Sequence, residues 1–344
     1  MTSVPELTMS RSALRSNIAA VAAQIAPSRL MLVVKDGAYR HGLEWTIDAA
    51  DQVHWFGAYD VVTALRVRAL RPDARVFAWA LATHDEIGRA IESDVDLGVG
   101  TMDYLQRVID TASRLGLVAR VHLKIDTGLH RNGVRPEQWP AFVAAAMQAQ
   151  RSGVLRVVGA WSHLSEASDA DDDESADVFR TATAALRDAG ADLEVEHLTA
   201  SAASWWRPEL RGSICRVGAF CYGIRSGDGP QIPGVVPVAT LSARAERVGG
   251  EGVEVGIGSL HGLPSTLTGQ PVATPGGVRS ILSIGPHSSV VEGWDGAAVG
   301  DRVLIHGPGD QGEADVTALG ERIDSIGEEI ALRLSPRVRR TVVD

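Results

Sequence analysis

The two lysines of the chain are the side chains best suited to covalent chemistry. Of 33 basic residues only Lys35 and Lys124 are lysines, and arginine supplies all the others. Arginine stays protonated and cannot form an imine, whereas a desolvated lysine can lose its proton and attack a carbonyl group. Lys35 ends the apolar run 30–35 and precedes a polar loop that contains glycine. This placement indicates Schiff-base chemistry; the alternative is that two lysines survive by chance in an arginine-rich composition.

Polar residues follow other apolar runs in the same way. They are Tyr39, Lys124, Arg131, His163, His197, Ser201, Arg216 and Gly218. Taken singly, each has an ordinary explanation, such as a core histidine, a capping serine or a surface arginine. Chemistry in a parallel barrel takes place at the carboxyl ends of the strands, so these residues would share one rim. Their joint placement therefore predicts a single site.

The pattern of apolar runs predicts the elements that must position this site. Eight runs are typical of strands and lie at 30–35, 53–57, 75–80, 95–99, 119–125, 155–161, 193–198 and 213–217. Segments with helical periodicity separate them, at 63–70, 85–92, 104–115, 137–150 and 176–188, with a shorter piece near Trp205. Strands that alternate with helices form a parallel sheet, and eight such units favour an α/β fold, a (β/α)8 barrel of the TIM type.

The composition changes after Ile224. Residues 225–230 form a turn-rich linker, and the remainder is rich in Val, Gly, Pro and Thr with little helical pattern. We therefore predict a barrel domain over residues 1–228 and a mostly β domain over residues 229–344. The acidic segment 166–174 is interpreted as a solvated loop. A cation-binding loop is the alternative, because its carboxylates follow a strand end.

Overall composition narrows the class of function. The 344 residues are 45% hydrophobic and carry a formal charge of −10, which argues against nucleic acid or an anionic membrane as partner. No run approaches the roughly 18 apolar residues of a membrane span, and residues 1–8 lack the features of a signal peptide. Cys215 and Cys221 suit a reducing compartment and are too few for a zinc site. We expect a cytoplasmic small-molecule enzyme without a metal.

Longer motifs around these residues resemble the alanine racemases and related fold-type III enzymes that depend on pyridoxal 5'-phosphate (PLP). Segment 33–42 is similar to the PLP-lysine signature, with Gly37 and Arg40 departing from the usual residues, and segment 124–134 is similar to the fifth-strand motif. Segments 161–164, 197–202 and 216–223 follow in the order and spacing of the family. The resemblance runs from about residue 8 to the end of the chain.

The resemblance implies PLP as cofactor, an amino acid as substrate and a homodimer. Lys35 would bind PLP covalently and act as one acid/base. The other implied cofactor contacts are Tyr39, Ser201 and the backbone N–H groups of Gly218 and Ala219 at the phosphate, His163 at the ring face, Arg131 at the phenolic oxygen, a carbamylated Lys124 that positions Arg131, and Arg216 at the pyridine nitrogen. Because arginine gives that nitrogen no proton, the electron sink is weakened, which suits reversible α-proton transfer.

The C-terminal part departs from the family at the second acid/base. A two-base racemase needs a proton-transfer group on each face of the substrate carbon, and the family places a tyrosine of the partner subunit on the second face. All four tyrosines of this chain precede residue 229, and the region 244–255, where that tyrosine should lie, looks shortened. The remaining candidates are His261 and His287, in loops expected near the barrel mouth. Segment 256–262 resembles the glycine-rich substrate loop of the family, whereas the methionine–aspartate pair of the family is missing near 285–287. Two solvent-exposed loop histidines are the alternative.

Three functions remain open from the sequence. The first is a racemase or epimerase of the alanine racemase type, with weak or absent activity on alanine. The second is a PLP enzyme with altered chemistry, such as decarboxylation, elimination or one-base epimerisation. The third is a catalytically silent PLP-binding protein, against which the predicted C-terminal domain counts, because such relatives consist of the barrel alone.

Overall fold

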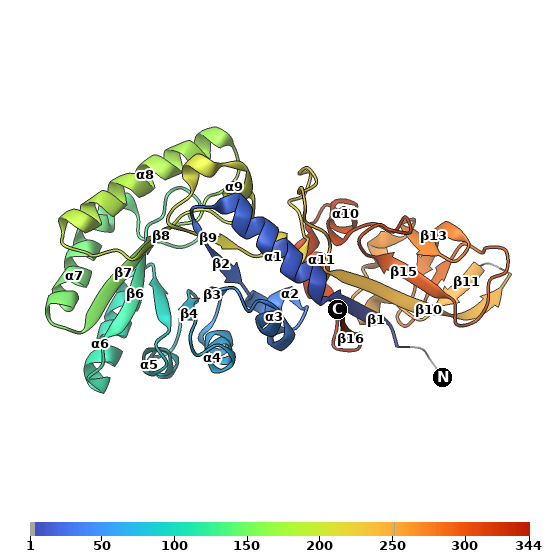
Figure 1. The fold of residues 1–344 in the computed structure, drawn as a ribbon, viewed down its shortest axis with the longest axis horizontal. Coiled ribbons are helices and arrows are strands. Elements are labelled where there is room, and N and C mark those ends of the chain that lie inside the picture. Colours follow the sequence, from blue (N-terminus) through green and yellow to red (C-terminus); the bar gives the residue numbers. More distant parts are fainter. Residues whose placement is uncertain (1–3, 251) are drawn as a thin grey trace. The chain divides into compact units, whose positions relative to one another are not determined.

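The computed structural model describes residues 4–250 and 252–344, and the chain divides into two compact units (Figure 1). One unit, here called the barrel unit, holds Val21–Lys35 and Asp51–Gly218. The other, here called the β unit, holds the chain up to Ala20 together with Asp36–Ala50 and Ala219–Asp344. Each unit therefore combines segments that are distant in the sequence. The boundary between residues 228 and 229 stays a prediction.

The barrel unit contains an eight-stranded parallel sheet in the order β8-β7-β6-β5-β4-β3-β2-β9. The strands are β2 (Arg29–Val33), β3 (Trp55–Ala58), β4 (Arg75–Ala78), β5 (Asp96–Val99), β6 (Ala119–Lys124), β7 (Leu155–Trp161), β8 (Val195–His197) and β9 (Ile214–Val217). The two outer strands approach each other, since the backbone N–H of Arg216 donates to the Thr199 carbonyl at 3.4 Å. The sheet is thus a nearly closed barrel, which confirms the predicted TIM-type fold.

Helices connect successive strands of this sheet. They are α4 (Val61–Leu70), α5 (His84–Glu92), α6 (Met102–Leu115), α7 (Trp139–Arg151), α8 (Asp169–Asp188) and α9 (Ser201–Trp206), while α1 (Arg11–Ile25) precedes β2. Local sequence fixes their ends. Thr83 and Glu86 form a capping box at the start of α5, and Gly116 ends α6 in the left-handed conformation that glycine adopts without strain.

The acidic segment 166–174 is mostly helical, so its interpretation as a solvated loop was wrong. Helix α8 begins at Asp169, and the Ser168 hydroxyl caps it by accepting from the Asp171 N–H at 3.1 Å. Carboxylates in the first helical turn are stabilised by the unpaired N–H groups and the positive end of the helix dipole. A run of acidic residues after a capping serine therefore favours a helix start.

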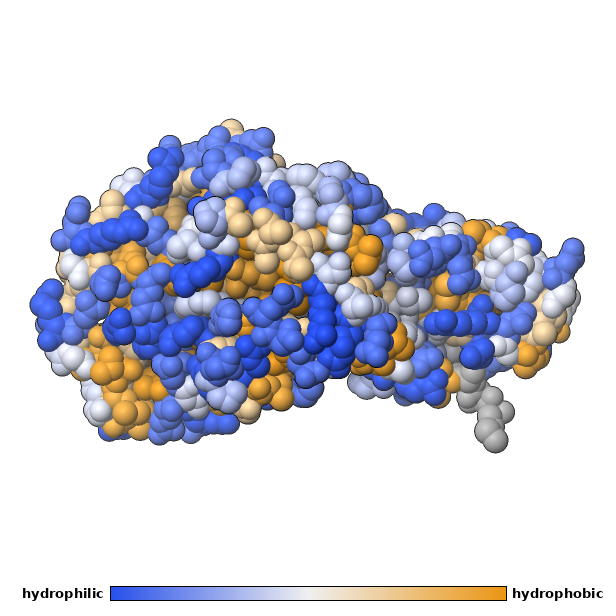
Figure 2. All heavy atoms as spheres, viewed as in Figure 1, coloured by the Kyte–Doolittle hydropathy of each residue, from blue (hydrophilic) through white to orange (hydrophobic). Residues whose placement is uncertain are grey.

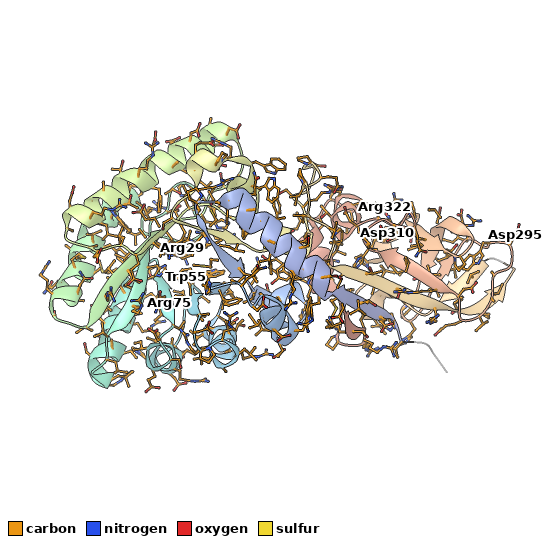
Figure 3. The ribbon with its side chains drawn as sticks, in the orientation of Figure 1. Arg29, Trp55, Arg75, Asp295, Asp310 and Arg322 are labelled. Atoms are coloured by element: carbon orange, nitrogen blue, oxygen red, sulfur yellow. The ribbon has the colours of Figure 1, made fainter. Side chains whose placement is uncertain are left out.

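Aromatic and apolar side chains fill the interior of the barrel unit. Met31, Trp55, Phe77 and Trp161 belong to one buried cluster. At the amino-terminal ends of the strands, the guanidinium groups of Arg29 and Arg75 lie 5.9 and 5.7 Å from the Trp55 ring centroid (Figure 3). Such cation–π contacts cover the large indole where the barrel would otherwise expose it to water.

The β unit is built on a second eight-stranded sheet, in the order β11-β14-β13-β12-β15-β10-β1-β16. The strands are β1 (Glu6–Ser10), β10 (Ala239–Gly249), β11 (Gly252–Val255), β12 (Pro271–Thr274), β13 (Gly277–Ile284), β14 (Ser289–Val291), β15 (Arg302–His306) and β16 (Arg339–Val343), with two short helices, α10 (Val316–Glu321) and α11 (Gly327–Arg333). The mostly β character predicted for the C-terminal part is confirmed. Strand β1, which was not predicted, pairs antiparallel with β10 and parallel with β16.

A left-handed turn follows strand β2. Within α2 (Lys35–Tyr39) and the next residue, φ is positive at every position from Asp36 to Arg40, between 54° and 65°. Left-handed non-glycine residues cost roughly 1–2 kcal/mol each, so the turn needs other contacts to persist. The N–H of Gly42 donates to the Gly37 carbonyl at 2.9 Å, and Arg340 donates to the Arg40 carbonyl at 3.0 Å. Helix α3 (Leu43–Ala49) then begins.

Hydrophilic and hydrophobic residues are interspersed on the face of the molecule seen in Figure 2. Among residues 4–250 and 252–344, none of the helices combines the length and the apolar character needed to cross a bilayer.

Candidate active site

Lys35 lies just beyond the carboxyl end of β2, as the sequence predicted for the amine. Strand β2 ends at Val33, and the N–H of Val34 still donates to the Gly57 carbonyl of β3 at 2.9 Å. The backbone of the sheet therefore fixes the chain up to the residue before Lys35. The Lys35 side chain is half-buried, so its amine is accessible at the rim of the barrel.

The charges of four cationic side chains of the barrel unit act on His163. Burial lowers the pKa of His163 to about 2, and the charges of Arg216, Arg131, Lys124 and Lys35 lower it further. The imidazole is therefore neutral at physiological pH. All five residues were predicted site residues, and the structure brings them together. Such a concentration of positive charge beside one amine suits an anionic ligand.

Lys124 is the buried member of this group. Its side chain is 4% exposed, and its Nζ lies 4.5 Å from the Trp161 ring centroid. Burial, together with the charges of Arg216 and Arg131, lowers the pKa of Lys124 to about 8. A fraction of Lys124 therefore carries an unprotonated, nucleophilic amine near neutral pH.

The loop after β6 presents Arg131. Asp126 organises it, because its carboxylate accepts from the backbone N–H groups of Gly128 and His130 at 3.2 and 3.0 Å. The His130 ring also donates to Asp126 at 2.9 Å. These contacts fix the turn that follows β6 and precedes Arg131.

Arg216 is held by a nearly complete set of acceptors. Its Nη1 donates to Nδ1 and to the carbonyl of His197, both at 2.9 Å. Its Nη2 donates to the Ser162 and Leu198 carbonyls at 2.8 and 3.0 Å and lies 3.2 Å from Nδ1 of His163. Burial lowers the pKa of Arg216 to about 10, so it stays protonated at neutral pH. A permanent donor is thereby fixed at the rim.

The predicted phosphate contacts form two pairs, one in each unit. In the barrel unit the N–H of Gly218 donates to the hydroxyl of Ser201, the first residue of α9, at 3.2 Å. In the β unit Tyr39 is buried and hydrogen-bonded to the Ala219 backbone, and burial raises the pKa of its phenol. All four groups are neutral at physiological pH and can donate a hydrogen bond to an oxyanion.

His261 and His287 lie in the β unit, and the charge of His287 acts on His261. Burial lowers the pKa of His261, and the charge of His287 lowers it further. The N–H of Gly258 donates to Nδ1 of His261 at 3.0 Å, so the neutral ring carries its proton on Nε2. The neutral His261 therefore presents an N–H donor at Nε2, whereas the exposed His287 has no such constraint in the described contacts.

The barrel unit also holds two site-linked residues that the sequence analysis missed, Asp96 and His122. Both are fully buried, and a hydrogen bond of 3.1 Å joins them. His122 is two residues before Lys124 in strand β6, and side chains two apart lie on the same face of a strand. This alternation was the signal that could have placed His122 inside the barrel beneath the predicted site.

The residues present fit PLP. The cofactor combines an aldehyde with an anionic phosphate and a phenolic oxygen, and the barrel unit offers an amine, an excess of positive charge and neutral donors. Two acidic groups, Asp126 and Glu166, act on this cluster, through Lys124 and Arg216 respectively. They leave a net positive charge among the four cations, which matches the charge of the cofactor.

Comparisons with known proteins agree with this fit. Residues 9–226 match the family model described as alanine racemase, N-terminal domain. The alanine racemase of Thermobifida fusca is 34% identical, over 99% of this chain and 98% of that protein. The solved alanine racemases of Streptomyces coelicolor and Streptomyces lavendulae superpose with TM-scores of 0.95 and 0.93 at 30% identity, covering 99% and 100% of this chain and 98% of each of theirs. The chain belongs to the alanine racemase family of PLP-dependent enzymes.

Proposed function

We propose that this enzyme transfers the α-proton of an amino acid between the two faces of its α-carbon, as a racemase or epimerase, and that alanine is a poor substrate. The observation that carries the proposal is the group of four cations around the neutral His163, with the Lys35 amine at a strand end. Such a site can hold an anionic cofactor and an amino-acid carboxylate beside an amine that exchanges protons.

Each predicted residue then has a physical role. PLP, when bound, withdraws electrons from the α-carbon of the substrate. Lys35 would bind the cofactor covalently and would then move the proton on one face. Ser201 and the N–H of Gly218 in the barrel unit, and Tyr39 and the N–H of Ala219 in the β unit, would be the phosphate donors. His163, kept neutral, would pack on the ring. Arg216, kept protonated, would donate to the ring nitrogen and limit the electron withdrawal to what a reversible proton transfer needs.

We further propose that Lys124 is carbamylated and positions Arg131. A carbamate forms when an unprotonated amine attacks carbon dioxide, and the lowered pKa of Lys124, about 8, supplies that amine. The product replaces a positive charge by a negative one beside Arg131 and Arg216. Burial of like charges is costly, so this exchange stabilises the site.

In our proposal, His261 or His287 transfers the proton on the second face of the substrate α-carbon. Chiral chromatography after incubation with L-alanine and a panel of other L- and D-amino acids tests this directly. We expect slow or undetectable conversion of alanine and faster conversion of another amino acid. In the His261→Ala, His287→Ala double variant that conversion should fall by about 10²-fold, the usual contribution of one general acid/base.

Tyr59 supplies the matched control for this experiment. It is the one exposed tyrosine among residues 4–250 and 252–344, at 49%, and it follows strand β3. The Tyr59→Phe variant should retain the conversion rate. Rapid alanine racemisation that persists in the double histidine variant would refute the proposal, and a loss in Tyr59→Phe would move the second base to the barrel.

The same panel decides on altered chemistry. Since no tyrosine lies beyond residue 228, decarboxylation, elimination or one-base epimerisation is the second candidate function. Release of carbon dioxide or ammonia without formation of the opposite enantiomer would establish it and exclude racemisation.

Both cysteines are buried free thiols, which supports action in the reducing cytoplasm.

We also propose a homodimer in which the C-terminal domain of one subunit covers the barrel mouth of its partner. An open barrel rim admits water, and covering it protects the reactive carbanion. Light scattering of the cofactor-loaded protein is expected to give twice the mass of the chain, and activity per subunit should fall on dilution below the dissociation constant. A fully active monomer would contradict this arrangement.

A further inference from the structure

Four buried side chains form a hydrogen-bonded chain through the interior of the barrel unit. They are Asp96 at the start of β5, His122 in β6, His197 at the end of β8 and Arg216 in β9. Oδ2 of Asp96 lies 3.1 Å from Nε2 of His122, and Nδ1 of His122 lies 2.8 Å from Nε2 of His197. Nδ1 of His197 then lies 2.9 Å from Nη1 of Arg216. This series of hydrogen bonds thus links the amino-terminal end of the barrel to the candidate site.

Aromatic neighbours hold each imidazole in one orientation. Phe77 stacks on His122 with ring centroids 4.6 Å apart, and Trp161 stacks on His197 at 5.7 Å. A Cβ atom on Gly159 would lie 2.6 Å from the His122 ring, so only glycine at this position of β7 leaves room for it. The rings therefore cannot turn over to exchange their nitrogen atoms without displacing packed neighbours.

The positions of the ring protons follow from Arg216. Its guanidinium can only donate, so Nδ1 of His197 must accept and the proton of this ring sits on Nε2. That proton faces Nδ1 of His122, which must accept in turn, so the His122 proton sits on Nε2. This proton faces Oδ2 of Asp96. Every contact is satisfied with one proton on each ring.

Asp96 is the last acceptor of this series of hydrogen bonds, and its carboxylate is ionised. Arg75 and Arg120 both donate to its Oδ1, at 2.6 and 2.8 Å, which leaves Oδ2 for His122. Burial alone would raise the pKa of Asp96, but the bond to His122 and the two arginines hold it well below its usual range. Glu194 steadies Arg120 through two hydrogen bonds of 3.1 and 2.7 Å.

We propose that Asp96 is a positioning residue: acting through His122, it sets the tautomer of His197, so that His197 offers a lone pair to Arg216 and holds its guanidinium in place. The consequence for catalysis rests on the proposed function, in which Arg216 donates to the ring nitrogen of the cofactor. The tautomers themselves do not depend on it.

The variant Asp96→Asn reverses the direction of the hydrogen bonds that join residue 96, His122 and His197. Two arginines donate to the position of Oδ1, where only the amide oxygen of asparagine can accept, so its NH2 group faces Nε2 of His122. His122 must then accept at Nε2 and carry its proton on Nδ1. His197 is forced to carry its proton on Nδ1 as well, opposite the Arg216 donor. Arg216 loses one acceptor, although the size and shape of residue 96 hardly change.

Nitrogen NMR of the cofactor-loaded enzyme labelled with ¹⁵N-histidine measures these tautomers. In the wild type we expect His122 and His197 protonated on Nε2, and in Asp96→Asn both protonated on Nδ1. The kcat of the variant should fall by about 10- to 100-fold, typical of lost support for an active group, with little change in KM. The absorption band of the bound cofactor should shift, because its ring nitrogen meets a displaced donor.

Glu194→Gln is the matched control. It removes a carboxylate that contacts Arg120, at the same end of the barrel, but leaves the hydrogen bonds from Asp96 to Arg216 intact. The tautomers, the absorption band and kcat should therefore stay as in the wild type. A wild-type His197 protonated on Nδ1 overturns the proposal even if no variant folds. Unchanged tautomers in Asp96→Asn, or the same change in Glu194→Gln, overturn it too. Correct tautomers in an enzyme without racemase activity would refute the proposed function alone.

Discussion

Replacement of Lys35 by alanine is expected to abolish covalent attachment of PLP and to lower turnover by on the order of 10³-fold or more, because one residue both binds the cofactor and moves a proton. The wild-type enzyme should show a visible absorption band that borohydride removes while fixing the cofactor to a single peptide. That peptide should contain Lys35, and the Lys35→Ala variant should show no such fixation.

Lys124→Arg is the matched control, because Lys124 is the only other lysine of the chain. This variant retains a cation and should keep the reducible band on the Lys35 peptide. A reducible band that survives in Lys35→Ala and disappears in Lys124→Arg would reverse the assignment of the two amines.

Acid is expected to unfold the protein steeply between pH 6.5 and 5, because several histidines are buried without charge. Burial lowers the pKa of both His41 and His306 to about 4, and it lowers those of His163 and His197 as well. In the unfolded chain a histidine takes up a proton near pH 6.5. Their stabilising effect is therefore complete above pH 6.5 and is lost as the pH falls toward the folded-state values. Each contributes about 1.4 kcal/mol per pH unit in that range.

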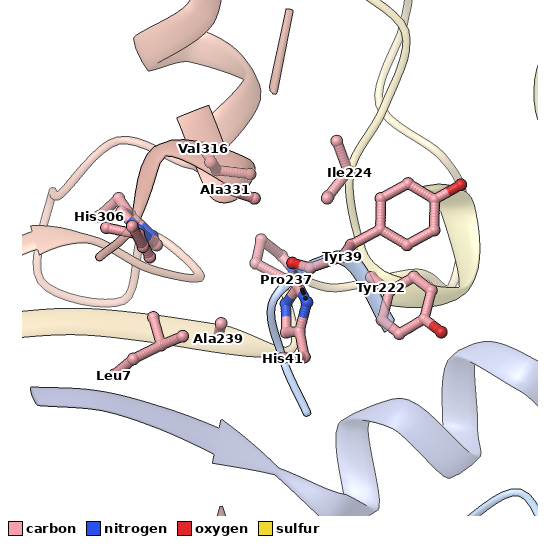
Figure 4. Close-up of a pocket in the computed structure, with 11 residues that line it drawn as sticks. Leu7, Tyr39, His41, Tyr222, Ile224, Pro237, Ala239, His306, Val316 and Ala331 are labelled. Atoms are coloured by element: carbon pink, nitrogen blue, oxygen red, sulfur yellow. Dashed lines mark hydrogen bonds between the residues drawn. The ribbon is translucent and has the colours of Figure 1, made fainter. Parts of the chain in front are cut away.

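His306 offers the sharpest variant for this experiment. It lines a small cavity of about 20 Å³ in the β unit together with His41 (Figure 4), and its buried Nε2 has no hydrogen-bond partner in the described part of the chain. Urea unfolding at several pH values should give a slope that is lower by about 1.4 kcal/mol per pH unit in His306→Gln. The exposed His54, changed to Gln, should leave the slope as it was. Equal slopes in both variants would contradict the explanation.

The barrel could be predicted from sequence because its strands are buried on both faces. Parallel strands covered by helices appear as continuous apolar runs, and all eight runs coincide with strands to within a few residues. Strand β1 could not be found by that signal, because only Leu7 and Met9 of its five residues are buried. The start of α8 was missed for a different reason, since its first turns are acidic and are stabilised by the helix terminus rather than by packing.

The site was predictable only where one residue type is chemically necessary. Lys35 was identified because an amine cannot be replaced by arginine, and the rim residues because they follow strands. Asp96 stands at the amino-terminal end of its strand, far along the sequence from any motif, and its relation to Arg216 appears only when β5, β6, β8 and β9 are placed in one barrel. The role of His261 or His287 stays a prediction.

The half-buried Lys35 and the buried Lys124 have a practical consequence, because the chain carries no other lysine. Reagents that acylate or cross-link side-chain amines find no target on the outer surface of the protein and can react only at the rim of the barrel, apart from the terminal amine. The number of dye molecules attached per chain would therefore report the occupancy of the catalytic rim by ligand, without any engineered label.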